Sequence, residues 1–203
     1  YGHVEAVGLD SFVSKVKNIS SNYTPKKRSD LSTEFLTNFE NKSSYEPSIT
    51  KPTDKQVIQY YTLGKRCNDI YYELEKNSSI IRRSQVNAIV EDIKSGVHSI
   101  FIHSDLGNGK TEVVEQLSRE LSNDYDIFLL NNNNDKISKE IELICNNDKK
   151  TIIIIENFFN YIDVYKKLKL FDKNKNIQYI FTARTSIYRA RVDELDIELG
   201  LSK

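Results

Sequence analysis

Beyond Gly96 the chain alternates short apolar runs with amphipathic stretches, and this pattern restricts the fold more than any other feature of the sequence. The apolar runs predict buried strands, and the stretches with apolar residues three and four positions apart predict helices. The expected strands are 99–103, 125–130, 151–155 and 177–182, and the expected helices are 110–121, 136–145 and 158–170. Such an alternation favours right-handed crossovers, so we expect an α/β fold in which helices flank a parallel sheet.

A glycine-rich loop joins the first expected strand to the next helix. Its sequence is Ser104-Asp105-Leu106-Gly107-Asn108-Gly109-Lys110-Thr111. It fits the phosphate-binding motif G-x-x-x-x-G-K-[ST] except at the first position, where Ser104 replaces glycine. Backbone N–H groups and the helix N-terminus of such a loop present a positive field to a polyphosphate. We therefore predict a P-loop that binds a nucleoside triphosphate together with Mg²⁺.

The residues of this loop have distinct expected roles. Two glycines would adopt positive φ and bring the backbone close to the phosphate oxygens. Lys110 would contact the β- and γ-phosphates, and Thr111 would offer its hydroxyl to Mg²⁺. The predicted nucleotide-binding residues of the loop are Ser104, Gly107, Asn108, Gly109, Lys110 and Thr111.

A run of four isoleucines, residues 152–155, precedes Glu156 and Asn157. In P-loop ATPases such a strand ends in a carboxylate near Mg²⁺, and a carboxylate one residue later polarises the attacking water. This chain has one acid at the two positions. Either Glu156 lies at the metal and Asn157 replaces the catalytic carboxylate, or Glu156 is the base and the metal-binding acid is missing. We favour Glu156 near Mg²⁺, which predicts slow hydrolysis, and leave the identity of the base open.

The last expected strand is followed by Thr182, Ala183 and Arg184. If this strand lies between the first and the third, Arg184 lies beside the γ-phosphate and can sense it or stabilise its charge. A surface arginine that caps a strand end is the alternative. No guanine-reading Asn-Lys-x-Asp element follows the strand, which favours ATP. In many such ATPases the base packs on the segment that leads into the domain, here residues 79–83, so Ile80 and Ile81 are candidate base contacts.

The remaining organisation is predicted as four regions. Residues 1–19 end a preceding, effector-type domain with a short helix over 9–19, and residues 20–55 form a linker with a small helix at 32–40. Residues 56–96 form a helical segment, in which Ser84 is the expected N-cap and Gly96 the expected stop of the last helix. Residues 97–203 form the P-loop core, truncated at its C-terminal end.

Composition excludes several classes of protein. Lys plus Arg equals Asp plus Glu at 29 each, so there is no bulk charge typical of a nucleic-acid or membrane-surface protein. Cys67 and Cys145 are far apart, without ligand spacing, which favours reduced thiols and a cytoplasmic location. The apolar runs are much shorter than the ~20 residues of a membrane span, so no membrane partner is expected.

These motifs together resemble the STAND class of signal-transduction ATPases over residues 79–195. The lead-in segment of that class has glycine where Arg82 stands, so Arg83 alone carries over as a nucleotide contact, and Glu156 stands where the class has aspartate. The resemblance implies a multidomain switch that couples a sensor, or a protein trigger, to an effector through homo-oligomerisation, in bacterial members for antiphage defence. ATP and ADP would be its ligands. Residues 1–16 resemble the C-terminal end of a sirtuin-like effector domain.

Two other functions remain as alternatives. An AAA-type motor or loader acting on nucleic acid would use basic clusters such as residues 26–28 and the group Lys166, Lys167 and Lys169. Such clusters are more often solvated faces, so a nucleic-acid partner is not expected. The third possibility is a scaffold that holds nucleotide without hydrolysing it.

Overall fold

The structure is a computed structural model, and the residues that it describes all belong to the unit formed by residues 33–203. They are residues 36–43, 52–63, 70, 71, 74, 80–146, 148–171 and 176–199, without the side chains of residues 61, 63 and 194–199. The helix expected at 9–19, the basic run 26–28 and the sirtuin-like segment lie outside the described residues. No helix in the described ranges is long and apolar enough to cross a membrane.

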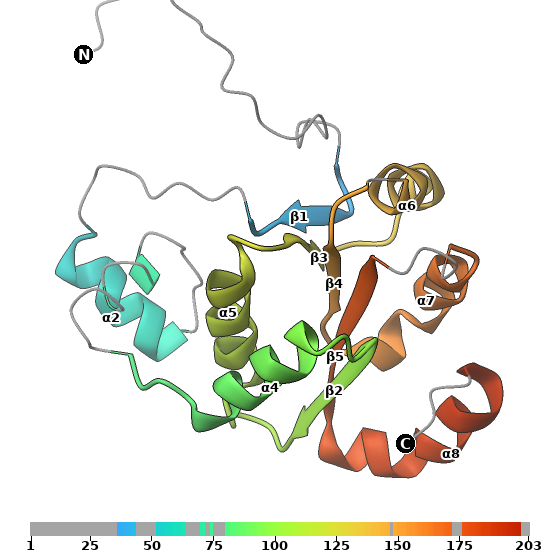
Figure 1. Ribbon diagram of the computed structural model, residues 1–203. Helices are drawn as coiled ribbons and strands as arrows, with labels where there is room; N and C mark the ends of the chain where they lie inside the picture. The colour runs from blue at the N-terminus through green and yellow to red at the C-terminus, as the bar shows by residue number, and fades with distance from the viewer. Residues whose placement is uncertain are drawn as a thin grey trace, which may run out of the picture. The chain divides into compact units, whose positions relative to one another are not determined.

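Five strands form one sheet in the order β1-β3-β4-β5-β2 (Figure 1). The strands are β1 (Phe39–Asn41), β2 (Ser99–Ser104), β3 (Asp126–Leu130), β4 (Thr151–Ile155) and β5 (Ile177–Arg184). Strands β2, β5, β4 and β3 pair in parallel, whereas β1 pairs antiparallel to β3 at the edge. The predicted α/β fold is confirmed, with the correction that the sheet is not wholly parallel.

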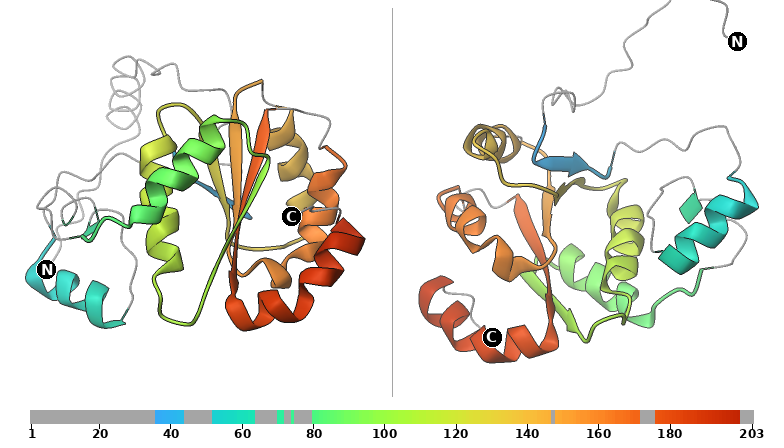
Figure 2. Two further views of the ribbon diagram at one scale, coloured as in Figure 1. Left: turned by 60° about the horizontal axis from the view of Figure 1, so that its bottom comes forward. Right: turned by 180° about the vertical axis from the view of Figure 1, so that it is seen from behind.

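Helices cover both faces of the sheet (Figures 1 and 2). On one face lie α4 (Ser84–Lys94) and α5 (Lys110–Leu121), and on the other lie α6 (Ile137–Cys145), α7 (Ile162–Lys169) and α8 (Thr185–Leu199). The helix predicted at 158–170 is divided into a 3-10 turn, η2 (Phe158–Asn160), and α7. Ahead of this layered core, α2 (Asp54–Leu63) is the first helix of the described part.

Strands β3, β4 and β5 bury both their faces, which explains their continuous apolar sequences. On the α4–α5 face, alternate residues such as Ile152 and Ile154 pack with Val86 and Leu117 in one apolar cluster. On the other face the rings lie in mutual contact, with centroid distances of 4.5 to 5.8 Å among Phe101, Phe158, Tyr165, Tyr179 and Phe181. Burial of each β4 isoleucine stabilises the fold by about 1.5–3 kcal/mol.

Strand β1 lies inside the segment that the sequence predicts as a linker. The small helix expected at 32–40 is wrong over residues 36–40, which end in this strand instead. The reason is a long-range contact: the buried carboxylate of Glu140 on α6 accepts hydrogen bonds from the backbone N–H groups of Thr37 and Asn38 at 3.0 and 2.9 Å. These bonds hold the backbone extended beside β3 and override its local helical spacing.

The boundary of α4 also differs slightly from the expectation. Arg83, with extended backbone, occupies the N-cap position and makes no side-chain capping bond, so the predicted N-cap Ser84 is instead the first helical residue. The predicted stop is confirmed, because Gly96 has φ +94° and its N–H donates to the carbonyl of Ile93. Arg83 is thereby fixed at the junction of the lead-in segment and the helix.

Candidate nucleotide-binding site

The predicted site residues gather at the carboxyl ends of three neighbouring strands. Strand β5 lies between β2 and β4, the position that the prediction for Arg184 required. Ser104 at the end of β2 is the register partner of Arg184 at the end of β5, and Ile155 at the end of β4 pairs with Phe181. In open α/β sheets ligands bind at such an edge, where the chain leaves adjacent strands in different directions.

The loop between β2 and α5 has the backbone that its glycines allow. Gly107 has φ +82° and Gly109 has φ +73°, so the predicted positive φ angles are both observed. Gly109 is the N-cap residue of α5, which directs the first N–H groups of the helix towards the loop. Asn108 is exposed, and its N–H donates to the carbonyl of Asp105 at 3.4 Å.

Lys110 is bound closely to the start of its own loop. Its ammonium donates to the carbonyl of Ser104 at 2.9 Å, to the hydroxyl of Ser104 at 3.1 Å and to the carbonyl of Asp105 at 3.0 Å. A lysine ammonium has three N–H donors, so these acceptors engage all of them. The hydroxyl contact exists because serine stands at the position where the motif has glycine.

Thr111 and Glu156 connect the loop to β4. The Thr111 hydroxyl donates to Oε1 of Glu156 at 2.8 Å, and both side chains are half-buried. The next residue, Asn157, adopts the left-handed conformation with φ 51° and ψ 50°, and its N–H donates to the hydroxyl of Thr182 on β5 at 3.2 Å. Glu156 therefore directs its carboxylate at the loop, while Asn157 turns the backbone towards β5.

Arg83 precedes the loop in sequence, and its side chain contacts the loop at Gly109. A Cβ built on Gly109 would come within 2.7 Å of an Nη atom of Arg83, so the guanidinium fills the space that a side chain would need. The Nε atom of Arg83 is buried and has no hydrogen-bond partner among the described residues. The positive φ favours glycine at this position, and a side chain there would also displace the flexible end of Arg83.

Not every predicted residue is brought into this cluster. The side chain of Ile81 is 79% exposed, and its backbone carbonyl, rather than its side chain, makes the contact with α5. Arg184 is exposed at the strand end next to Ser104. Its position beside the loop agrees with a phosphate-sensing role and with a surface strand cap alike.

Sequence reasoning missed Gln116, which is 5% exposed on α5 and bonds to both Ile81 and Arg83. The available signal was weak: a glutamine next to the apolar positions Val113 and Leu117 is unremarkable in an amphipathic helix. The sequence also did not predict the hydrogen bond from the backbone N–H of Asn157 to the hydroxyl of Thr182. This bond depends on the left-handed turn at Asn157, which strand periodicity does not indicate.

The donor set of this cluster suits a magnesium nucleotide. Lys110, Arg83 and the N-terminus of α5 supply positive charge around a loop whose glycines leave its backbone open, as polyphosphate binding needs. The buried Nε of Arg83, which has no partner among the described residues, is the kind of group that a phosphate oxygen satisfies. Thr111 and Glu156 offer a hydroxyl and carboxylate oxygens, the ligands that Mg²⁺ prefers.

Comparison with protein families points to the same part of the chain. A family profile described as "Novel STAND NTPase 5" matches residues 68–196. No curated protein sequence matches the chain. Among solved structures, similarity is found to Hsp104 with ATPγS and FITC casein in a closed state, at 13% identity and a TM-score of 0.47, over 60% of this chain and 27% of that chain.

Two further solved structures are PCH-2 of C. elegans and Trip13 of Rhizobiales. The first is 16% identical with a TM-score of 0.37, over 54% of this chain and 37% of that chain. The second is 15% identical with a TM-score of 0.32, over 66% of this chain and 52% of that chain. The chain therefore spans between about a quarter and a half of the lengths of the three structures.

Proposed function

The chain belongs to the novel STAND NTPase 5 family, and from this premise we propose that it binds ATP with Mg²⁺ in the loop 104–111 and hydrolyses it slowly. The observation that carries the proposal is the hydrogen bond from Thr111 to Glu156. It joins the loop that would hold the phosphates to the strand end that would hold the metal. The two residues are 45 positions apart in sequence, and their hydroxyl and carboxylate oxygens are both suitable Mg²⁺ ligands.

Each residue has a part in binding. Lys110 would exchange the bonds to its own loop for bonds to the β- and γ-phosphates, and the backbone N–H groups of the loop would bind the same oxygens. Arg83 adds a second cation at Gly109, and Arg184 lies next to Ser104 at the γ-phosphate end. Bound Mg²⁺ would neutralise charge on the phosphates, held by the hydroxyl of Thr111 and the carboxylate of Glu156.

Slow turnover follows from the residue after Glu156. If the carboxylate of Glu156 is engaged by Thr111 and the metal, the position for polarising water falls to Asn157, whose amide does not accept a proton at neutral pH. A site of this composition holds its ligand longer than it turns it over. That property suits a switch, in which ATP and ADP stabilise different states.

At the level of the whole protein, we propose that this module couples a sensor or a protein trigger to an effector through nucleotide-dependent homo-oligomerisation, as in antiphage defence. The support is family membership and the incomplete catalytic pair at Glu156 and Asn157. In this arrangement residues 1–19 end the effector, residues 20–55 link it to the core and contribute β1 to its sheet, and the helices of 56–96 lead into the P-loop domain. Light scattering of the full-length protein with ATP and with ADP tests this: the same mass in both would contradict it.

Binding is tested by calorimetric titration of ATP into the chain and into Lys110→Ala. The variant loses the side chain that would contact the β- and γ-phosphates, so binding should fall below detection. Lys139→Ala is the matched control, because Lys139 is exposed on α6, remote in sequence from the loop. Undiminished binding by Lys110→Ala would refute the proposal, and equal affinities for ATP and GTP would refute the assignment of adenine.

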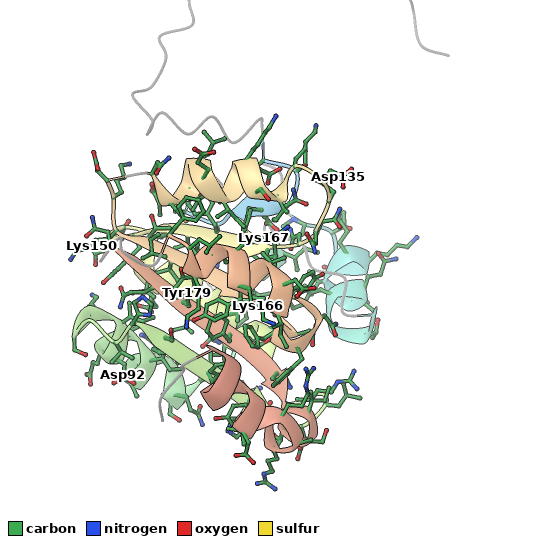
Figure 3. The ribbon with its side chains drawn as sticks, turned by 90° about the vertical axis from the view of Figure 1, so that its right-hand side faces the viewer. Asp92, Asp135, Lys150, Lys166, Lys167 and Tyr179 are labelled. Atoms are coloured by element: carbon green, nitrogen blue, oxygen red, sulfur yellow. The ribbon has the colours of Figure 1, made fainter. Side chains whose placement is uncertain are left out.

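The alternative function, an AAA-type motor or loader on nucleic acid, rests on Lys166 and Lys167. Both are exposed on α7, and Figure 3 shows them on one side of the molecule with Lys150 and Asp135. A contact surface for phosphates would give salt-dependent DNA binding and DNA-stimulated hydrolysis. Fluorescence anisotropy with labelled DNA at low and high salt separates this function from the switch.

A further inference from the structure

Gln116 is a buried amide in the middle of the helix that begins at the phosphate loop. Its Oε1 accepts a hydrogen bond from the backbone N–H of Arg83 at 3.0 Å, and its Nε2 donates to the backbone carbonyl of Ile81 at 3.0 Å. Nε2 also lies 3.3 Å from Oε1 of Glu112, one turn earlier in α5. The side chain is 5% exposed, so these bonds form largely away from water.

The contacts to the lead-in segment have the geometry of strand pairing. In an extended chain, the carbonyl of one residue and the N–H two residues later point to the same side, as the backbone at Arg83 with φ −81° and ψ 127° permits. A primary amide presents one donor and one acceptor at matching spacing. Gln116 therefore replaces the neighbouring strand that this segment lacks, and it satisfies both backbone groups.

This clamp fixes the position of Arg83 relative to the loop. Gly109 is the N-cap of α5 and Gln116 lies in the same helix, so the two are held at constant separation by the helix itself. With its backbone bound to Gln116, Arg83 places its guanidinium against Gly109. The orientation of the Arg83 guanidinium then depends on the Gln116 amide.

We propose that Gln116 is a positioning residue that aligns Arg83 with the phosphate loop and so sets the affinity for ATP. The proposal rests on the function proposed above, since it assigns Arg83 to the bound nucleotide. Gln116 itself does not touch the nucleotide. Its contribution passes through Arg83, whose buried Nε lacks a hydrogen-bond partner in the described part of the chain.

The test is a double-mutant cycle on ATP affinity with Gln116→Met and Arg83→Ala. Methionine keeps the length of the side chain but neither donates nor accepts the two bonds. Two lost hydrogen bonds predict a fall in ATP affinity of about 5- to 100-fold. In the Arg83→Ala background the same change should alter affinity by less than about twofold, because the residue through which it acts is gone.

Two further variants keep the outcome interpretable. Gln85→Met is the matched control, since Gln85 is exposed on α4, and its affinity should equal that of the wild type. Gln116→Glu is isosteric but sets an oxygen against the carbonyl of Ile81 and the carboxylate of Glu112, so it should also weaken ATP binding. This variant takes the place of Gln116→Met in the cycle if the methionine variant is unfolded. Urea unfolding of each variant establishes that it is folded.

The two proposals fail in different ways. If the wild-type chain binds no ATP, or Lys110→Ala binds it as well as the wild type, the proposed function is wrong. If the wild type binds ATP and Lys110→Ala does not, but folded Gln116→Met binds as tightly as the wild type, the positioning role is wrong. Additive losses of affinity in Gln116→Met and Arg83→Ala would equally overturn it, because they indicate that Gln116 acts independently of Arg83.

Discussion

The hydroxyl of Thr111 lies 2.8 Å from Oε1 of Glu156 and donates a hydrogen bond to it. This bond places the carboxylate beside the first turn of α5 and so favours one of the two registers that the sequence leaves open. In that register Thr111 and Glu156 would both hold the metal, and the water-polarising position would belong to Asn157. The bond supports the assignment of Glu156 to the metal, and the predictions below test that assignment and the roles of its neighbours.

Glu156→Gln should remove most of the Mg²⁺ dependence of ATP binding. The amide oxygen still accepts the bond from Thr111, but the charge that attracts the metal is lost, and a change of this kind lowers metal affinity by about 10- to 100-fold. The measurement is calorimetry with ATP in Mg²⁺ and in EDTA. Glu142→Gln, an exposed position on α6, is the matched control, and a retained Mg²⁺ dependence in Glu156→Gln would count against the metal assignment.

Ser104→Ala should tighten nucleotide binding. The Ser104 hydroxyl accepts one of the three N–H bonds of Lys110, and a phosphate must compete for that donor. Release of one such bond predicts a gain in affinity of about 2- to 10-fold, measured by calorimetry. Ser104→Thr keeps the hydroxyl and should resemble the wild type, whereas weaker binding in Ser104→Ala would mean that the hydroxyl helps to orient Lys110.

The order of strands and helices from β2 to β5 was predictable because each element buries an apolar face, whereas α8 was not predicted. The run 152–155 reads as a buried strand whatever surrounds it, and the helix at Lys110–Leu121 has the predicted bounds. The loop was predictable for a different reason, since its glycines are required by the positive φ angles that the structure has.

Strand β1 was not predictable, because its cause lies elsewhere in the chain. Thr37 and Glu140 are 103 residues apart, and no local pattern around Phe39 anticipates that a carboxylate on α6 will hold this backbone extended. The same limit applies to Gln116, whose bonds to Ile81 and Arg83 reach back more than 30 residues. Local periodicity predicts which face is buried, but not which polar group will satisfy a distant backbone.

Glu140 should make the docking of β1 depend on pH. Burial raises the pKa of Glu140, but the bonds donated by the backbone and side chains of Thr37 and Asn38 outweigh it, so the pKa lies below its ordinary value of 4.5. A lowered folded-state pKa gives stability that is fully present above the unfolded-state pKa and is lost as pH falls through the folded-state value. The wild type should therefore lose stability below about pH 4.5.

Glu140→Gln tests this pH dependence. The amide of glutamine places its NH₂ group against N–H donors that need an acceptor. Near neutral pH the substitution should therefore lower the free energy of unfolding by about 1–3 kcal/mol. The stability difference from the wild type should shrink as pH falls below 4.5, because the wild-type carboxylate then becomes protonated. Urea unfolding across this range measures it, with Glu142→Gln as control. A constant difference would show that the charge of Glu140 is not what holds β1.

Asn157→Asp should accelerate ATP hydrolysis. The left-handed backbone at this position, φ 51° and ψ 50°, is tolerated by Asn and Asp but costs other side chains about 1–2 kcal/mol, so Asp adds a carboxylate without a change of backbone. With Glu156 engaged by Thr111, that carboxylate stands where a general base acts, which is worth roughly 10²–10⁴-fold when well placed. Even imperfect placement should raise the single-turnover rate about tenfold, while Asn160→Asp, exposed in η2, should not. An unchanged rate in Asn157→Asp, together with complete loss of hydrolysis in Glu156→Gln, would instead make Glu156 the base.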